Sequence, residues 1–360
     1  MDNIKKLVER MEKETIKIKE DYQIAIMCNS RSKTRKINGQ ILEFSDTNEF
    51  FSDQEFCEIK EGIQNAGFFV HSFFNELTLM QEFLKESIYQ NNKIVYNLSR
   101  NGKHVGKKSL IPAFLDLMNI PYTGSNALVT SLCREKYTYT KYLQAHGIFV
   151  PKSYLYLGKG RWLNNEKPTF NTKVIIKLMQ ESASIGLSQD SIMIINKENI
   201  KHIENSYFNT NKYILIQEFI EGYECEVPLF VTENKEIFTM SPVGISINKS
   251  ENLKSSILTY EHSCKDDYEF YELHTEIGAE NCFYLQENAK KVAELMGITN
   301  YGRIDFRIDY SGIPYLIDIA ASPYTTNHSS FAFSFKSLNI NYKNIYSTII
   351  GIAYLNTKLN

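Results

Sequence analysis

The sequence predicts an α/β fold, and three observations support this prediction. The chain has 360 residues and 43% hydrophobic content, which is enough for a large core and for two or three domains. Short apolar segments alternate with helical segments in its first third, a pattern typical of a parallel sheet with crossover helices. Near the other end, residues 303–319 form an alternating pattern of charged and apolar residues interrupted by a tight turn, which indicates a β-hairpin.

Composition and charge exclude several classes of protein. The formal net charge of −2 lacks the basic excess of a nucleic-acid binder. The six cysteines are scattered without CxxC spacing, so we expect buried thiols in a reducing compartment, with neither a zinc knuckle nor a disulfide framework. Apolar runs are too short to cross a bilayer, and the N-terminus is a charged helical segment unlike a signal sequence. We therefore expect a cytoplasmic protein without nucleic-acid or membrane partners.

The N-terminal segment 4–22 is predicted to be a charged helix. Its apolar residues fall on one side, and either Ile16 or Ile18 completes that side. We interpret residues 1–22 as a helical extension added before the first strand.

A parallel sheet is predicted next. The strands are expected at 23–28, 67–73 and 93–98, with helices near 53–66 and 75–90 between them. Because ligands of such sheets gather beyond the carboxyl ends of the strands, residues 29–31 and 99–107 are expected at a binding site.

The middle of the chain continues the α/β pattern. Helices are predicted at 109–118 and 135–146, with a short strand and turn at 120–125. After a polar connector, VIIK at 174–177 predicts a new strand, and a further apolar strand stops at QEFI, 217–220.

The hairpin carries the most specific local signal. In RIDFRID, the residues Arg303, Asp305 and Arg307 alternate with apolar ones, so they share one face of a strand. Antiparallel pairing across Ser311-Gly312 would bring Asp318 beside Asp305. Two carboxylates on one rung suit Mg²⁺, which prefers oxygen ligands and shares them with phosphates. The alternative is an amphipathic hairpin with a solvated charged face.

Several motifs follow one another in an order that resembles the ATP-grasp fold, and most closely the D-alanine:D-alanine ligase group. These motifs are IPYTGS, CREKYTYTKYL, GIFVPKS, VIIK with the following Ser/Gly loop, LIQEFIEGYECEV, GRID and LIDIAASP, and they cover roughly residues 93–350. The resemblance implies ATP and Mg²⁺, or Mn²⁺ in its place, small amino-acid-like carboxylate and amine substrates, and a homodimer. The carboxylate would be activated as an acyl phosphate and attacked by the amine.

The resemblance also implies a domain organisation. A pre-ATP-grasp α/β domain with the parallel sheet would follow the extension, and two ATP-grasp subdomains would complete the chain. The predicted boundaries are 1–22, 23–125, 126–240 and 241–360.

The resemblance assigns most nucleotide-binding residues to two lysines, a loop, a strand end and one glutamate. Phosphate contacts fall on Lys136 and Lys177, the phosphate-covering loop on Ser182, Ala183 and Ser184, the adenine contact on Glu218, Phe219 and Ile220, and the ribose contact on Glu224. A lysine at a strand end is well placed to offer a point charge to phosphates. The alternatives are a surface lysine at 136 and a strand-edge glutamate at 224.

The resemblance places catalysis and metal binding near the hairpin. Arg303 would stabilise the oxyanion at the acyl carbon, and Asp305 and Asp318 would bind the metal. Ser329 would contact the carboxylate of the second substrate, and Ser184 is a further catalytic candidate. The alternative for Ser329 is the N-cap of the helix that follows it.

The chain departs from the ligase pattern where substrates would bind. Ala320 stands where the ligases have a metal-binding asparagine, and Tyr324 stands where they have a glycine. The segment 28–36 is basic and lacks the glutamate that holds an ammonium group, so Arg31, Lys33 and Arg35 suit an anion unless the loop is simply solvated. In the closing loop, Ser263 and Cys264 replace a Lys-Tyr pair, and Lys265 is a possible substitute.

These patterns predict an ATP-dependent carboxylate–amine ligase with a preserved nucleotide half and a rebuilt acceptor half. Its substrates are expected to differ from two D-alanines. The alternatives are a genuine D-alanine:D-alanine or D-alanine:D-lactate type ligase, and an ATP-binding protein without catalysis. A purely structural protein would require every ordered motif to be a coincidence.

Overall fold

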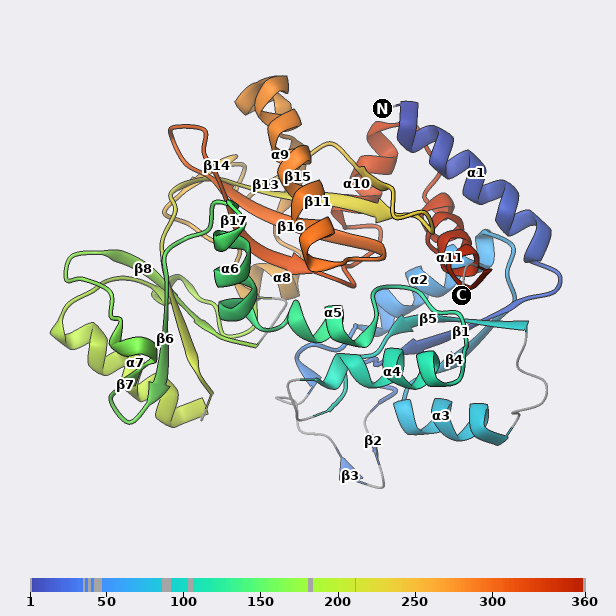
Figure 1. The fold of residues 1–360 in the computed structure, drawn as a ribbon, viewed down its shortest axis with the longest axis horizontal. Coiled ribbons are helices and arrows are strands. Elements are labelled where there is room, and N and C mark those ends of the chain that lie inside the picture. Colours follow the sequence, from blue (N-terminus) through green and yellow to red (C-terminus); the bar gives the residue numbers. More distant parts are fainter. Residues whose placement is uncertain are drawn as a thin grey trace.

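The computed structural model describes residues 2–34, 36–37, 40–41, 47–85, 92–102, 106–180, 184–210 and 212–358 (Figure 1). Its helices are α1 (Asp2–Ile18), α2 (Asp53–Asn65), α3 (Glu76–Lys85), α4 (Leu110–Leu117), α5 (Ala127–Leu132), α6 (Lys136–Ala145), α7 (Lys197–Thr210), α8 (Tyr260–Lys265), α9 (His274–Met296), α10 (Ser330–Ser337) and α11 (Lys343–Lys358). In this part of the chain, no helix is both long and apolar enough to cross a membrane.

The strands belong to four sheets. The first half of the chain contributes β1 (Gln23–Cys28), β2 (Lys36–Ile37), β3 (Gln40–Ile41), β4 (Val70–Phe73), β5 (Lys93–Leu98), β6 (Ser153–Gly158), β7 (Arg161–Trp162) and β8 (Lys173–Leu178). The second half contributes β9 (Ile192–Ile194), β10 (Ile214–Glu218), β11 (Gly222–Val231), β12 (Ile237–Thr239), β13 (Val243–Ser246), β14 (Asn252–Lys254), β15 (Glu269–Glu272), β16 (Asn300–Ile308) and β17 (Pro314–Ala320).

The N-terminal sheet is parallel, in the order β4-β1-β5. This confirms the predicted crossover pattern, and β1 and β5 begin and end where expected. Strand β4 begins at Val70 instead of residue 67. The reason is the turn that ends α2, in which Gly67 has a φ of 98° and donates its N–H to Gln64 O.

Helix α1 packs against α11, so the first and last helices of the described chain lie side by side (Figure 1). Ile18 is buried and Ile16 is 57% exposed, which settles the alternative left by the sequence. At Gly351 of α11, a Cβ atom would lie 3.2 Å from Met11, which indicates that the helices approach closely. The segment predicted as an extension thus contributes to the core of the N-terminal sheet.

Besides the short pair β2–β3, the described residues form two larger antiparallel sheets. One has the order β7-β6-β10-β8-β9 and packs on α7, and the other has the path β15-β13-β11-β16-β17 and packs on α9 (Figure 1). The chain passes from the first sheet to the second between Glu218 and Gly222. The domain boundaries stay a prediction.

The hairpin β16–β17 has the predicted register, with Asp305 opposite Asp318. The alternative of a solvated charged face is wrong, because Asp305 and Arg307 are 8% and 3% exposed. Strand β11 pairs with the other edge of β16, and the charged side chains of the hairpin line a cleft.

The described cysteines are consistent with the predicted thiols. Cys28, Cys133, Cys225 and Cys282 are buried and free, whereas Cys57 is exposed on α2. The side chain of Cys264 lies outside the described residues.

Candidate active site

A cleft of about 520 Å³ lies where the two antiparallel sheets meet the N-terminal domain. Most described residues predicted for the site line it, namely Lys136, Lys177, Ser184, Glu218, Phe219, Ile220, Glu224, Arg303, Asp305, Asp318 and Ser329. Ser182 and Ala183 lie outside the described residues. The fold therefore brings together groups that are up to 193 residues apart in the chain.

Two lysines form the cationic wall of the cleft. Lys136 begins α6, is 7% exposed and forms an ion pair with Asp318, so the alternative of a surface lysine is wrong. Lys177 lies in β8, where burial and, to a lesser extent, the charge of Lys136 lower its pKa to about 8. Ser184 follows on the loop after β8, with a φ of 53°. Closely spaced lysines of this kind suit a polyphosphate.

The chain crossing between the sheets forms a second wall. Glu218 ends β10 and donates its N–H to Lys152 O at 2.9 Å, and Phe219 donates to Lys173 O at the same distance. The remaining wall is apolar and is made by Ile175, Leu178, Ile257, Leu258 and Ile317. Apolar lining residues together with two lysines in one cleft suit a nucleotide, which has an apolar base and charged phosphates.

Glu224 is paired with a residue to which the sequence gave no role. Arg307, opposite it on β16, donates from Nη1 to Glu224 Oε2 at 2.8 Å, and its guanidinium lies 4.8 Å from the Phe219 ring. Burial raises the pKa of Glu224, and Arg307 opposes this increase. Glu224 faces the cleft, so the alternative of a solvated strand-edge glutamate is wrong.

Asp305 and Asp318 lie opposite each other and are each held by a cation. Lys136 pairs with Asp318, which also accepts a hydrogen bond from Tyr139 Oη at 3.1 Å. Burial alone would raise the pKa of Asp318, but Lys136 holds it below its usual range. Burial raises the pKa of Asp305.

This donor set fits a divalent cation that is shared with phosphates. Two carboxylates facing a cleft with two lysines provide hard oxygen ligands, and phosphate oxygens or water would complete the shell. Among the described residues, no group of three or more His, Cys, Asp or Glu side chains could hold a metal without such help. Ala320, which follows Asp318 on β17, adds no ligand.

Arg303 is fixed in place by two carboxylates. Its Nε and Nη2 atoms donate to the two oxygens of Asp305 at 2.8 and 2.7 Å, and Nη1 lies 3.0 Å from Glu226 Oε1. A guanidinium held this firmly meets the need for a preorganised donor near developing charge. Burial raises the pKa of Glu226 to about 7. Sequence reasoning missed Glu226, although it lies two residues after Glu224 on the same strand and therefore points to the same face.

Ser329 caps a helix and also lines the cleft. Its Oγ accepts a hydrogen bond from Ala332 N at 3.2 Å and donates to Thr326 O at 2.6 Å. The N-cap interpretation is therefore confirmed, and contact with a substrate stays a prediction. Beside it, His328 pairs with Asp266 and its ring lies 4.6 Å from that of Tyr268.

The N-terminal domain closes the cleft with residues from its loops and from the start of α2. These residues are Arg31, Asn48, Ser52, Gln54, Glu55 and Glu58. Of the three basic residues predicted to suit an anion, Arg31 lines the cleft, Lys33 lies over the rings of Phe56 and Phe74, and Arg35 is outside the described residues.

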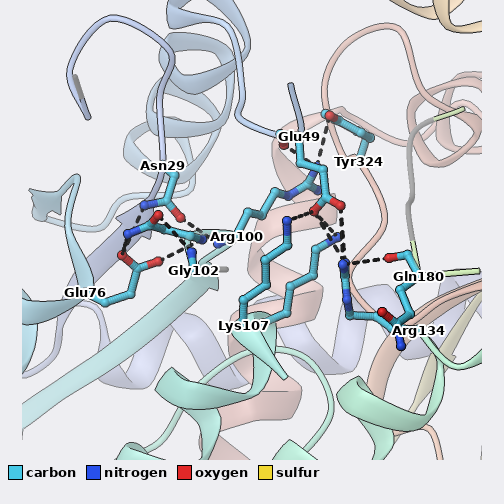
Figure 2. A network of polar contacts seen from close by, with 11 residues as sticks. Asn29, Glu49, Glu76, Arg100, Gly102, Lys107, Arg134, Gln180 and Tyr324 are labelled. Carbon is cyan, nitrogen blue, oxygen red and sulfur yellow. Dashed lines mark hydrogen bonds and ion pairs between the residues drawn. The ribbon is translucent and has the colours of Figure 1, made fainter. Parts of the chain in front are cut away.

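A buried charge network connects this domain to Gln180, which follows β8 (Figure 2). The carboxylate of Glu49 is surrounded by the side chains of Lys107, Lys108 and Arg134 at 3.2 to 3.4 Å. Arg134 also donates to Gln180 O at 2.7 Å, directly before the loop that follows β8. The sequence alone gave no indication of this cluster, because Glu49 lies far from its partners in the chain.

Comparison with known proteins identifies similar chains. The family model described as "D-ala D-ala ligase C-terminus" matches residues 143–351. D-alanine–D-alanine ligase B of Clostridium perfringens is 28% identical over 265 residues, which are 73% of this chain and 81% of that protein.

Two solved structures are similar over nearly the whole chain. D-alanine–D-alanine ligase from Bacillus anthracis, also solved with ATP, has a TM-score of 0.67 and 15% identity, covering 94% of this chain and 99% of its own. VanG D-Ala:D-Ser ligase from Enterococcus faecalis has a TM-score of 0.64 and 18% identity, covering 92% and 99%. These similarities confirm the predicted fold class.

Proposed function

This chain belongs to the D-alanine–D-alanine ligase family of ATP-grasp carbon–nitrogen ligases, and we propose that it joins a carboxylate and an amine other than two D-alanines. The observation that carries the proposal is the convergence of Lys136, Lys177, Asp305, Asp318 and Arg303 on one cleft. Each of these side chains suits one part of the reaction. Lys136 and Asp305 are buried, and the other three are partly buried, so charge interactions among them are stronger than at an exposed surface.

The proposed reaction has two steps. A carboxylate oxygen of the donor attacks the γ-phosphorus of ATP, and the bond to the bridging oxygen breaks to release ADP. The amine then attacks the acyl carbon, the bond to the phosphate oxygen breaks, and phosphate and a proton leave. Lys136 and Lys177 offset phosphate charge, and Arg303 donates to the acyl oxygen as its negative charge develops. Mg²⁺ held by Asp305 and Asp318, or Mn²⁺ in its place, would supply further charge stabilisation.

The acceptor half supports substrates other than two D-alanines. Tyr324 lines the cleft, and its hydroxyl accepts a hydrogen bond from Arg100 Nη1 at 3.0 Å. Its ring also lies 4.9 Å from that of Phe51, so the tyrosine is held in place and takes up space in the cleft. Arg31 adds a positive charge to the lining of the cleft.

The test is phosphate release from Mg-ATP with pools of D- and L-amino acids and small carboxylates, followed by mass spectrometry of the products. We expect an amide product and little product from D-alanine alone. Arg303→Met is the inactive control. Efficient formation of D-alanyl-D-alanine would replace our proposal with the ordinary family reaction.

Two alternatives have specific support. A genuine D-alanine:D-alanine or D-alanine:D-lactate type ligase is favoured by the names of the relatives. An ATP-binding protein without catalysis is favoured by Ala320, which cannot coordinate a metal. The first predicts turnover with D-alanine, and the second predicts ATP binding without turnover for any pool.

We propose a homodimer in the cytoplasm, in keeping with the sequence analysis. Light scattering coupled to size-exclusion chromatography would give a mass near twice 41.8 kDa. A mass of one chain at micromolar concentration would contradict the dimer.

A further inference from the structure

We infer that Arg307 is a positioning residue for nucleotide recognition: it holds one oxygen of the Glu224 carboxylate, so that the other oxygen is presented to the sugar hydroxyls of a ribonucleotide. This inference rests on the proposed function, in which Glu224 contacts the ribose, and it adds a residue that had no role in the sequence analysis. Arg307 would then control the preference for nucleotides that have sugar hydroxyls.

The guanidinium of Arg307 is held by three segments of the chain. Its Nη1 atom donates to Glu224 Oε2 on β11 at 2.8 Å and to Ser256 O at 3.0 Å, and Nη2 donates to Lys254 O, at the end of β14, at 3.1 Å. The centroid of the Phe219 ring lies 4.8 Å from the guanidinium carbon. A planar fork with this many contacts has little freedom to move, and it restricts the carboxylate that it binds.

Glu224 is held through only one of its two oxygens. The structure assigns Oε2 to Arg307 and gives Oε1 no contact among the described residues. The side chain lines the cleft and is 13% exposed. Because carboxylate oxygens accept hydrogen bonds and sugar hydroxyls can donate them, Oε1 suits the ribose. The orientation of this acceptor depends on Arg307.

Arg307 also favours the charged form of Glu224. Burial raises the pKa of Glu224, whereas Arg307 and, to a lesser extent, Lys177 lower it. The charge matters for binding, because a hydrogen bond to an ionised acceptor is about twice as strong as one between neutral groups. The ion pair therefore supports the ribose contact through orientation and through charge.

Lys173 provides a matched comparison in the same region. Its Nζ atom lies 5.3 Å from the centroid of the Phe219 ring, so this lysine and Arg307 are both cations beside that ring. Lys173 pairs with Glu221, and among the described residues it has no contact with Glu224. Lys173→Met therefore removes a cation beside Phe219 and leaves the ion pair of Glu224 in place.

Two other roles for Arg307 give different outcomes. If Arg307 only holds the three segments together, its replacement weakens the binding of all adenine nucleotides by the same factor. If it contacts the ribose itself, through the Nε atom that has no hydrogen bond among the described residues, its replacement lowers the preference even when Glu224 is already changed. A role through Glu224 predicts that the two substitutions are not additive.

The experiment measures, by calorimetry, the Kd of Mg-ATP and of Mg-dideoxy-ATP, which lacks both sugar hydroxyls, without donor or acceptor substrate. We expect the wild-type protein to bind ATP about tenfold more tightly, as for a hydrogen bond to a charged group. Arg307→Met and Glu224→Ala should each remove most of this preference, and the double variant should have the same preference as Glu224→Ala. Lys173→Met should keep the wild-type preference.

Arg307→Lys is the second variant, because Arg307→Met removes a buried charge and is expected to be less stable. Lysine keeps a cation but lacks the fork that holds the carboxylate and two carbonyl oxygens, so the preference should lie between those of wild type and Arg307→Met. Circular dichroism would identify the variants that are folded. An unchanged preference in a folded Arg307 variant, or a further loss in the double variant, would overturn the inference.

The same titrations separate this inference from the proposed function. Absence of ATP binding by the wild-type protein would overturn the proposed function, and the inference with it. ATP binding without a preference for sugar hydroxyls would overturn the inference alone. The expected preferences without any amide product would support the inference and count against the ligase reaction.

Discussion

Burial shifts the pKa values of individual side chains in the cleft away from their ordinary values. Lys177 shows this most clearly, because its pKa of about 8 lies well below that of an exposed lysine. Phosphates bind the protonated form of a lysine, and their own charge favours that form. ATP binding is therefore expected to depend on pH in a range where most lysines do not titrate.

We predict that the affinity for Mg-ATP is highest below pH 8 and falls above it, by up to tenfold per pH unit as Lys177 loses its proton. Calorimetric titrations between pH 7 and 9.5 would measure the effect. Lys177→Arg should flatten the dependence, since arginine stays charged throughout this range. A wild-type affinity that does not change with pH would contradict this role.

A second prediction at the level of residues concerns the ion pair between Arg307 and Glu224. Both side chains are largely buried, at 4% and 13% exposure, so removal of the arginine leaves a buried carboxylate unpaired. Arg307→Met should lower the free energy of unfolding by about 3–5 kcal/mol. Denaturant unfolding would measure this change.

The double variant Arg307→Met with Glu224→Gln is the control. It should recover much of the lost stability, because no unpaired charge remains, yet it should still bind ATP weakly. Equal destabilisation in the single and double variants would show that packing of Arg307 against Phe219 matters more than the ion pair.

Some site residues can be predicted from the local sequence pattern, and others cannot. Asp305 and Asp318 were predictable because a two-residue period and a tight turn fix their register. Glu226 was missed, because its neighbours Arg303 and Ser330 become known only when β11 pairs with β16 and α10 packs beside them. Arg307 lay on the predicted charged face, but its partner Glu224 is on β11, and the pairing of that strand with β16 was not predicted.

At the scale of elements, the Glu49 network joins the N-terminal domain to β8. Burial would raise the pKa of Glu49, but Lys108, Arg134 and Lys107 hold it well below the usual range. A carboxylate whose pKa is lowered on folding adds stability that is present above its unfolded pKa. That stability is lost as the pH falls toward the folded value.

We predict that Glu49→Gln lowers the free energy of unfolding by about 3–5 kcal/mol at pH 7, because it leaves several buried cations without their shared counter-ion. Wild type should also lose stability more steeply than the variant as the pH falls below 4.5, the ordinary pKa of a glutamate. Thermal unfolding across this pH range would measure both effects. Parallel curves for the two proteins would rule out the proposed charge of Glu49.

The bounds of single helices and strands were predicted better than the packing between them. The strands β1 and β5 and the helix α2 follow from apolar periodicity, so their bounds match closely. The packing of α1 on α11 could not be predicted, because the two helices are at opposite ends of the chain. The contact from Arg134 to Gln180 could not be predicted either, because these residues are also far apart in the chain.

At the scale of the whole molecule, two sheets and an N-terminal domain build a cleft with two chemically distinct halves. The order of modest motifs along the chain was enough to predict the fold, and the nucleotide half stays a prediction. The half that we propose for the acceptor is lined by the N-terminal loops, α2 and the segment 259–270, so its shape depends on tertiary packing. Sequence patterns therefore predict the reaction class better than the substrates.

The central claim is that a carboxylate is activated by transfer of phosphate from ATP. The most direct test supplies a donor whose carboxylate carries ¹⁸O, together with Mg-ATP and an amine, and determines the isotope content of the released phosphate by mass spectrometry. Formation and breakdown of an acyl phosphate predicts one ¹⁸O atom in each phosphate. Release of phosphate without ¹⁸O would contradict the account and indicate simple hydrolysis of ATP.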